Sequence, residues 1–252
     1  MIWQKPAQKS CKKPPRLRTE QMGNFKHERV NLGYDDLCAE TRSTGRTYTA
    51  PDGSTYPSIT TVLSILSRDS IQAWRARVGE EEANRVSRIA SSRGTAVHDL
   101  LEKYVNNDPD FAKGVMPHIL QSFHDVKEQL DSRLTTVYGQ EAPLYSEHLG
   151  LAGRVDCVGV WDGKNSIVDY KTSRRLKKKE WVKGYFMQCC AYAIMWEERT
   201  GQPITQLVIL IAVDNEEPQV FIEHRDNWVK PLFNVIEQYN TEKKRRNIWG
   251  VK

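Results

Sequence analysis

Two stretches of the chain carry apolar residues at helical spacing. Residues 71–104 form the first, which we expect to fold as two or three helices. The apolar stripe of the second consists of Ile119, Phe123, Val126 and Leu130. Ahead of both, the sequence RTYTAPDGSTYPSIT at 46–60 centres on Pro-Asp-Gly, a strong turn signal, and predicts a β-hairpin. Ser58 or Thr60 is positioned to cap a helix that follows this hairpin.

The middle of the chain changes to the pattern that is typical of strands. Alternating or continuously apolar runs predict five strands, at 135–144, 153–161, 166–171, 206–213 and 220–223. The sequence DGKN at 162–165 predicts a tight turn between the second and the third strand. We expect a helix from about Lys178 to Arg199, ended by Gly201, and a final amphipathic helix from Asn227. This order predicts an α/β fold with a mixed central sheet flanked by helices.

Charge is distributed unevenly along an otherwise ordinary composition. Hydrophobic residues make up 39% and charged residues 27% of the 252 positions, which is typical of a globular protein. Residues 1–19 carry six basic residues and no acidic one, and the rest of the chain is nearly balanced. We therefore expect residues 1–44 to be a basic tail or irregular lead-in, which is either simply solvated or attracts phosphates. No apolar run is long enough for a membrane helix, and no secretory signal is expected.

The five cysteines include no Cys-x-x-Cys pair. This pattern favours reduced thiols in a cytosol-like compartment and disfavours a structural zinc site. No nucleotide-binding P-loop occurs either, so motor or kinase chemistry has no support.

Candidate chemistry lies on the two strands that the DGKN turn joins. Asp169 and Lys171 are two residues apart and should face the same side of one strand, and the turn brings Asp156 alongside. Taken alone, such a pair is more often a surface salt bridge. Here the neighbouring residues, Val155, Val158, Ile167 and Val168, indicate buried strands, where charges are costly unless they are paired or bound to a metal. Two carboxylates and a lysine predict a Mg²⁺ site that hydrolyses a phosphate ester.

The stretch GRVDCVGVWDGKNSIVDYKTS at 153–173 resembles the catalytic hairpin of the PD-(D/E)XK nuclease superfamily. Asp156 matches its first acid, Asp169 its second acid, and Lys171 its lysine; the position before Asp156 is valine instead of proline. The resemblance implies divalent metal, Mg²⁺ or Mn²⁺, held by Asp156, Asp169 and the carbonyl of Tyr170, with Lys171 assisting hydrolysis.

Two further segments are similar to RecB-like nucleases. SSRGTAVHDLLEKY at 91–104 resembles the upstream helix that turns a histidine, here His98, towards the metals. FMQCCAYAIMW at 186–196 resembles the following helix with its Q-x-x-x-Y pattern, which implies a catalytic role for Gln188 and contact with the nucleic acid for Tyr192. RecB-like enzymes often add a glutamate ligand on the preceding strand, and we prefer Glu141 to Glu147, which falls in a turn.

The hairpin phrase YPSITTVLS at 56–64 resembles the mitochondrial genome maintenance exonucleases and their phage counterparts. This likeness extends from about residue 46 to residue 213 and implies cleavage of single-stranded DNA from free ends. Some related nucleases anchor an iron–sulfur cluster through C-terminal cysteines, but no cysteine follows Cys190, so no cluster is expected. We expect residues 45–252 to form one RecB-like nuclease domain, with a hairpin and helical cover at 45–92 and a catalytic core at 93–252.

Basic and aromatic residues cluster directly after the predicted catalytic lysine. They are either a solvated face or a track for phosphates and bases. The candidate DNA contacts are Arg93, Arg174, Arg175, Lys177, Lys178, Lys179, Trp181, Lys183, Tyr185 and Tyr192.

The sequence therefore predicts a Mg²⁺- or Mn²⁺-dependent DNA exonuclease acting on single strands in replication, recombination or repair. We expect it in the cytoplasm of a bacterium or a phage-infected host, in preference to a mitochondrion, with no membrane partner. Two alternatives remain open at this point. One is a structure-selective or double-strand nuclease, and the other is a DNA-binding module that keeps the fold without the chemistry.

Overall fold

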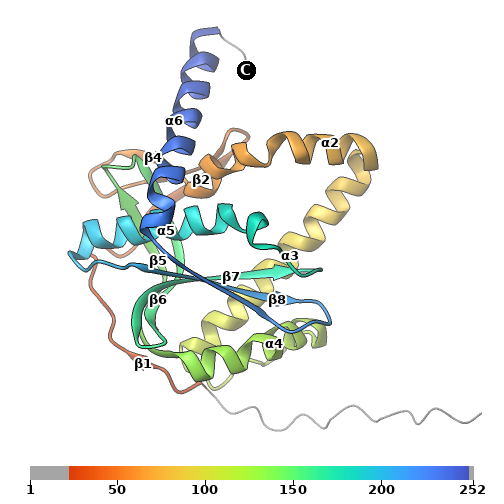
Figure 1. The fold of residues 1–252 in the computed structure, drawn as a ribbon, viewed down its shortest axis with the longest axis vertical. Helices are drawn as coiled ribbons and strands as arrows, with labels where there is room; N and C mark the ends of the chain where they lie inside the picture. The colour runs from red at the N-terminus through yellow and green to blue at the C-terminus, as the bar shows by residue number, and fades with distance from the viewer. Residues whose placement is uncertain (1–22, 250–252) are drawn as a thin grey trace, which may run out of the picture.

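The computed structural model describes residues 23–249, which are built around a six-stranded mixed sheet (Figure 1). The strands lie in the order β1-β5-β6-β7-β8-β9, in which β1 with β5 and β7 with β8 are parallel and the other neighbours are antiparallel. Their bounds are β1 Lys26–His27, β5 Leu134–Ser146, β6 Leu151–Trp161, β7 Lys164–Ser173, β8 Gln206–Val213 and β9 Gln219–His224. The predicted mixed sheet is confirmed.

The turn between β6 and β7 is the tight one that DGKN predicts. Trp161 pairs with Lys164, and the two residues between them, Asp162 and Gly163, have φ values of 49° and 75°. Two successive left-handed residues make the turn whose twist matches that of a hairpin, and Asp-Gly is well suited to it. This turn sets the register that brings the two candidate acids to neighbouring strands.

Helices cover both faces of the sheet and give it two cores. α1 (Ile59–Leu63), α5 (Lys183–Thr200) and α6 (Asp226–Trp249) pack on one face, and α3 (Glu80–Val105) and α4 (Pro117–Arg133) on the other. The apolar stripe that the sequence placed on the second helical stretch is buried along α4. α5 ends at Gly201, whose φ of 72° and backbone N–H bond to Glu197 confirm the predicted helix stop.

The lead-in is more structured than the sequence suggests. Within the described part, β1 pairs with β5, and β2 (Cys38–Arg42) joins β3 (Gly45–Thr49) and β4 (Thr55–Pro57) in a separate three-stranded sheet. The hairpin of β3 and β4 is the predicted one, and the Ser58 hydroxyl caps α1 by accepting from the backbone N–H of Thr61. Residues 1–22, which include the six basic residues of the first nineteen positions, lie outside the described residues.

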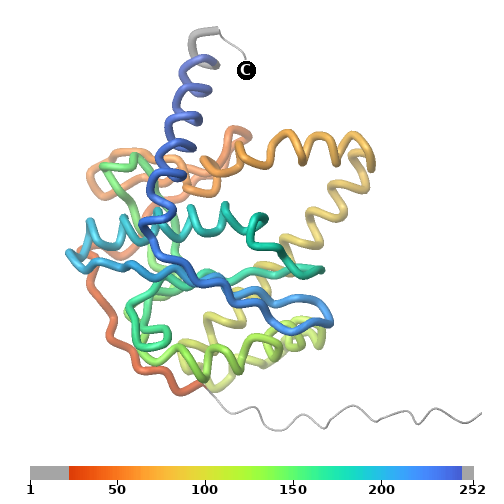
Figure 2. Tube along the Cα trace, viewed as in Figure 1, coloured from red at the N-terminus to blue at the C-terminus, as the bar shows by residue number. Residues whose placement is uncertain are grey.

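A helical arch projects from the body. The 3₁₀ turn η1 (Ser64–Leu66) leads to α2 (Arg68–Val78), none of whose residues is buried, and α3 returns from its far end to the sheet. Figures 1 and 2 both show α2 and the first half of α3 extending away from the sheet and meeting at an angle. α3 runs unbroken from Glu80 to Val105, so the expected boundary between cover and core at 92/93 falls inside one helix. Among residues 23–249, no helix combines the length and apolarity needed to cross a membrane.

Candidate active site

β6 and β7 pair over only part of their length, and a space opens where they separate. The last antiparallel pair is Cys157 with Val168, and from there β7 continues paired with β8 alone. The Asp156 carboxylate lies in the opening, where its Oδ2 accepts a hydrogen bond of 2.8 Å from the backbone N–H of Tyr170. The Asp156 side chain therefore accepts the hydrogen bond that a backbone carbonyl of β6 would accept in a continuous pairing. This bond fixes the Asp156 carboxylate where the two strands separate.

Asp169 and Lys171 project together from β7, as their spacing predicts. Lys171 Nζ forms an ion pair with Oδ2 of Asp169, whose side chain is fully buried. Asp169 Oδ1 has no hydrogen-bond partner among the described residues. The ammonium also lies 5.2 Å from the centre of the Tyr185 ring. A buried carboxylate with an unused oxygen is energetically costly and is a ready ligand for a cation.

Two further side chains reach Asp156 from other elements. His98 on α3 places Nδ1 3.6 Å from Asp156 Oδ1, and Glu141 lies beside Asp156 in the β5–β6 pairing. One ligand atom from each of His98, Glu141 and Asp156 lies within 4.8 Å of the other two. These residues come from α3, β5 and β6, which the chain brings together only in the folded state.

The backbone at Glu141 is strained in a way that sequence patterns do not reveal. Its φ is 44°, in the left-handed region where a non-glycine residue costs on the order of 1 kcal/mol. Arg154 Nη1 donates a hydrogen bond of 2.6 Å to its carbonyl, and Arg154 is itself paired with Asp36. Arg154 and Asp36 therefore help to position Glu141, and neither was among the residues that the sequence singled out.

The pKa values of the cluster indicate an excess of negative charge. Burial, followed by the charges of Asp156 and Glu102, raises the pKa of Glu141 to about 7. Burial also raises the pKa of Asp169 to about 6, although the charge of Lys171 opposes this shift. Burial would raise the pKa of Asp156 as well, but its His98 hydrogen bond and the nearby Lys171 outweigh burial and lower it.

The basic partners of these acids have raised pKa values. Burial disfavours the charged form of Lys171, but Asp169 and Asp156 outweigh it and hold its pKa above the ordinary value. In the same way, the Asp156 hydrogen bond outweighs burial and raises the pKa of His98. Three carboxylates thus face a single permanent cation, which is the electrostatic setting in which a divalent ion is most stabilising.

The donor set fits a divalent metal. Carboxylate oxygens from two or three acids and one imidazole nitrogen suit Mg²⁺ or Mn²⁺, and the nitrogen suits manganese better. His98, Glu141 and Asp156 would hold the ion, with Asp169 Oδ1 available beside them. Tyr170 contributes its backbone N–H to Asp156 in this structure, and the role predicted for its carbonyl stays a prediction.

α5 closes the other side of the cluster. Gln188 is half-buried and donates a 3.5 Å hydrogen bond from Nε2 to the Tyr192 hydroxyl. Tyr192 is only 2% exposed, and its ring packs against Gly153, where a Cβ would approach to 2.8 Å. The predicted contact between Tyr192 and nucleic acid is therefore not available in this conformation because the ring is covered. Its position instead supports Gln188.

The candidate DNA contacts divide into exposed and occupied groups. Arg174, Arg175, Lys178, Lys183 and Trp181 are exposed, and Lys178 lies 5.6 Å from the Trp181 ring centre. Lys179 is paired with Glu223. The run is mostly extended instead of helical up to the short turn η2 (Lys179–Trp181), because Gln219 bonds both the backbone N–H and the carbonyl of Lys177. The predicted helix thus begins five residues late, at Lys183.

Arg93, another candidate DNA contact, is held by bonds within the fold. It lies in the middle of α3, where Nη1 donates a 2.8 Å bond to Asp214 and Nη2 a 3.0 Å bond to Ser122. Gly94 and its small neighbours do not interrupt this helix, which is continuous from Glu80 to Val105. Arg93 ties α3 to α4 and to the turn after β8, and these bonds occupy much of its capacity to contact a phosphate.

The model of the PD-(D/E)XK nuclease superfamily matches residues 72–246, more than half of the chain. The chain belongs to this superfamily. The match spans every acid of the cluster and the helices on both sides of it. The resemblance that the catalytic hairpin suggested is confirmed, and so is a nuclease of this class. Nucleases of this superfamily generally use divalent metals, which agrees with the donor set.

Two individual proteins are also similar to the chain. Human "Mitochondrial genome maintenance exonuclease 1" is 22% identical over 210 residues, which cover 76% of this chain and 60% of that protein. The chain thus spans less than two thirds of the length of this relative. A crystal structure named "Putative exonuclease" from Eubacterium rectale aligns with a TM-score of 0.44 and 16% identity, over 61% of this chain and 66% of that one.

Proposed function

We propose that this PD-(D/E)XK protein is a metal-dependent deoxyribonuclease that hydrolyses single-stranded DNA from free ends, in replication, recombination or repair. The observation that carries the proposal is the convergence of Asp156, Asp169 and Lys171 with His98 and Glu141 in the opening between β6 and β7. The exonuclease part draws support from the name of the human relative. A reducing, cytosol-like location belongs to the same proposal, since the four cysteines that the structure describes are free thiols.

In this proposal the chain's own residues orient the reacting groups. A bound Mg²⁺ or Mn²⁺ would polarise the phosphodiester and make a bound water more acidic. Lys171 lies against Asp169 and remains protonated, so its ammonium is available to stabilise negative charge that develops on the phosphate. Gln188, held by Tyr192, presents its amide from the α5 side, where it can orient the phosphate or the attacking water.

Two uncovered glycines on the helices that flank the cluster favour a single strand as substrate. Gly94 lies one helical turn before His98 on the same face of α3, and no atom stands within 4 Å of where its Cβ would be. The same is true of Gly184 at the start of α5. Trp181, which is 61% exposed beside Lys178, offers a ring on which a base can stack. These uncovered positions on α3 and α5, together with Lys178 and Trp181, suit contact with a strand of stacked bases.

A substrate panel tests this proposal. Linear single-stranded, closed circular single-stranded and duplex DNA, each end-labelled or uniformly labelled as its form allows, should be incubated with Mg²⁺ or Mn²⁺. We expect rapid loss of the linear single strand and resistance of the circle. Rapid digestion of circles would refute the requirement for a free end and leave the nuclease intact. Preference for duplex DNA would refute single-stranded DNA as the substrate. Absence of cleavage on every substrate would refute the nuclease activity.

A further inference from the structure

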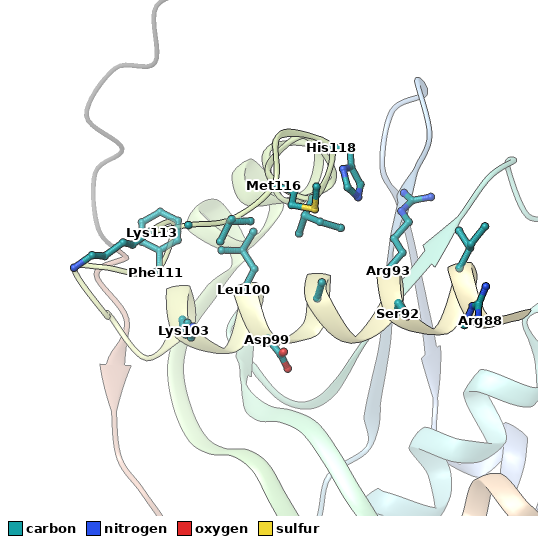
Figure 3. A pocket seen from close by; sticks show the side chains of 15 residues that line it. Arg88, Ser92, Arg93, Asp99, Leu100, Lys103, Phe111, Lys113, Met116 and His118 are labelled. Carbon is teal, nitrogen blue, oxygen red and sulfur yellow. The ribbon is translucent and has the colours of Figure 1, made fainter. Parts of the chain in front are cut away.

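Two adjoining cavities form a groove on the side of α3 that faces away from His98. The larger, about 650 Å³, lies between α3 and the segment that leads into α4, and Figure 3 shows its lining. The second, about 590 Å³, lies between α3, α4 and the end of β7. Both are lined by Ile89, Arg93 and His118, so they are continuous. Ala96, which lines the groove, is two residues from His98 and hence about 200° around the helix.

The groove begins where the catalytic strand ends. Thr172, Ser173 and Arg174 line its nearer end, and they directly follow Lys171 in β7. From there it runs along α3 to Lys103 and Lys113, which lie towards the other end of the row of labelled residues in Figure 3. A strand that leaves the metal cluster past the tip of β7 therefore meets this groove next.

The lining carries a surplus of positive charge. Six of its residues are arginine or lysine and three are aspartate. Asp214 is already paired with Arg93, and in the described part of the chain no ion pair involves Arg88, Lys103, Arg174 or Lys177. Like cations that line one concave surface repel one another unless an anion lies between them, so the groove is electrostatically prepared for a polyanion.

The lining of the groove also includes apolar side chains that are exposed. Ile89 is 43% and Met116 is 62% exposed, although both line the cavity between the cations. Solvent contact with large apolar side chains is unfavourable, and a flat nonpolar partner would relieve it. A single-stranded nucleic acid offers such faces at intervals, with a phosphate between each pair, and matches both features of the lining.

We propose that this groove between α3 and α4 is a second DNA-binding surface, which holds several nucleotides of the strand beyond the scissile phosphate. The inference rests on the proposed function and extends it to residues outside the metal cluster. An acidic peptide would match the charge as well, but continuity with the end of β7 favours the nucleic acid strand. The groove residues bind and do not react, so their effects should appear in affinity and not in the chemical step.

Ser92 allows a matched test because it is an exposed helical residue that lines the groove and has no role in the cluster. Ser92→Lys adds one cation, and Ser92→Glu adds one anion, at the same position. Binding of a long fluorescent oligothymidylate should be measured by anisotropy in a chelator, over a range of salt concentrations. One added or lost phosphate contact changes the slope of log affinity against log salt concentration by about 0.7. Over a tenfold range of salt, from about 1 M to 0.1 M, this corresponds to a change in affinity of about fivefold. Ser92→Lys should bind more tightly by that amount and Ser92→Glu more weakly.

The controls separate this surface from long-range charge effects. Asn240→Lys and Asn240→Glu make the same changes at an exposed position of α6, far from α3 and α4 (Figure 1), and should leave affinity unchanged. Arg88→Ala with Lys103→Ala should reduce the slope by about 1.4, for two lost contacts. Cleavage of an oligonucleotide too short to reach the groove should be equal in all of these variants.

The outcomes distinguish this inference from the function on which it rests. If the Ser92 pair binds like wild type, or shifts no more than the Asn240 pair, the groove is not a DNA path, whatever else it binds. That result leaves cleavage at the metal cluster untouched. If wild-type protein fails to cleave any DNA with metal present, the proposed function itself fails, independently of how the Ser92 variants bind.

Discussion

α3 is a single helix whose two halves lie in different environments. From Val97 onward it packs into the core and presents His98 to the buried acids, whereas between Glu80 and Arg93 it buries only Ala83. Through His98, the buried half contacts the cluster of acidic side chains in which opposite charges lie close together. The exposed half, with α2, contributes little to a core. Under the proposed function, the buried half would serve the chemistry and the exposed half the handling of the substrate.

The largest effects should follow changes in the buried cluster. Asp156→Asn and Asp169→Asn should each reduce the rate of DNA cleavage at least about a hundredfold, as expected for loss of one preorganised charged group. The isosteric amides should preserve the fold, which circular dichroism and thermal unfolding can verify. Near-normal turnover in either variant would show that the reaction centre lies elsewhere and that the buried half of α3 does not face it.

The acids of the cluster should also make metal binding depend on pH. The pKa of Glu141 is raised to about 7 and that of Asp169 to about 6, so protons compete with metal as the pH falls through this range. Because raised carboxyl pKa values favour the folded state only while the groups are protonated, the metal-free protein loses this stabilisation as the pH rises through 6–7.

The measurement is the increase in melting temperature caused by Mn²⁺, at pH 5.5 and at pH 8. We expect a larger increase at pH 8, and Glu141→Gln should melt higher than wild type at pH 8 without metal. An increase that is the same at both pH values would exclude competition between protons and metal at these carboxyls. His98 must also lose its proton before its nitrogen binds the metal, so it adds to the same pH dependence, and the comparison of Glu141→Gln with wild type isolates the contribution of Glu141.

A smaller effect is expected in the exposed half of α3. Gly94→Trp fills the open space before His98 and should slow cleavage of single-stranded DNA on the order of tenfold, about 1.4 kcal/mol. Gly94→Ala is the matched control, which should keep the rate and stabilise the helix by about 0.5–1 kcal/mol. Mn²⁺ binding should be the same in both. Equal rates for the two variants would show that no strand passes this face of the helix.

The basic run after β7 should have the smallest effect and alter only affinity. Lys177→Ala with Lys178→Ala should reduce the salt slope of DNA binding by about 1.4. Lys179→Ala should change it less, because Lys179 is paired with Glu223. The metal requirement should not change. If Lys179→Ala alone reduces the salt slope by the full amount, the Lys179–Glu223 ion pair does not persist in solution. The assignment of Lys177 and Lys178 as the phosphate contacts is then wrong.

The sequence predicts well those features that depend on local patterns. The β6–β7 turn, the α1 cap and the α5 stop each follow from residues within a few positions, and Asp169 and Lys171 share a face because a strand has a period of two. β1 was missed because its partner, β5, lies far along the chain, and β2 was missed because its own residues show no apolar alternation, although its partner β3 follows it directly.

Long-range contacts explain the remaining differences at the site. Nothing in the sequence near Arg93 indicates that Asp214, 121 residues away, would occupy its guanidinium. Likewise, Arg154 bonded to the carbonyl of Glu141 is a consequence of how β5 and β6 pair. The roles of the individual site residues follow from motif and geometry together and remain predictions until they are measured.

The central claim is that the buried acids act through a bound divalent metal, and chelation tests it most directly. Cleavage of linear, end-labelled single-stranded DNA should be followed in Mg²⁺ or Mn²⁺, after addition of excess chelator, and again after the metal is restored. The account predicts that cleavage stops on chelation and recovers when metal is returned, since the carboxylates require a cation to engage the phosphate. Cleavage that continues undiminished in excess chelator would contradict it.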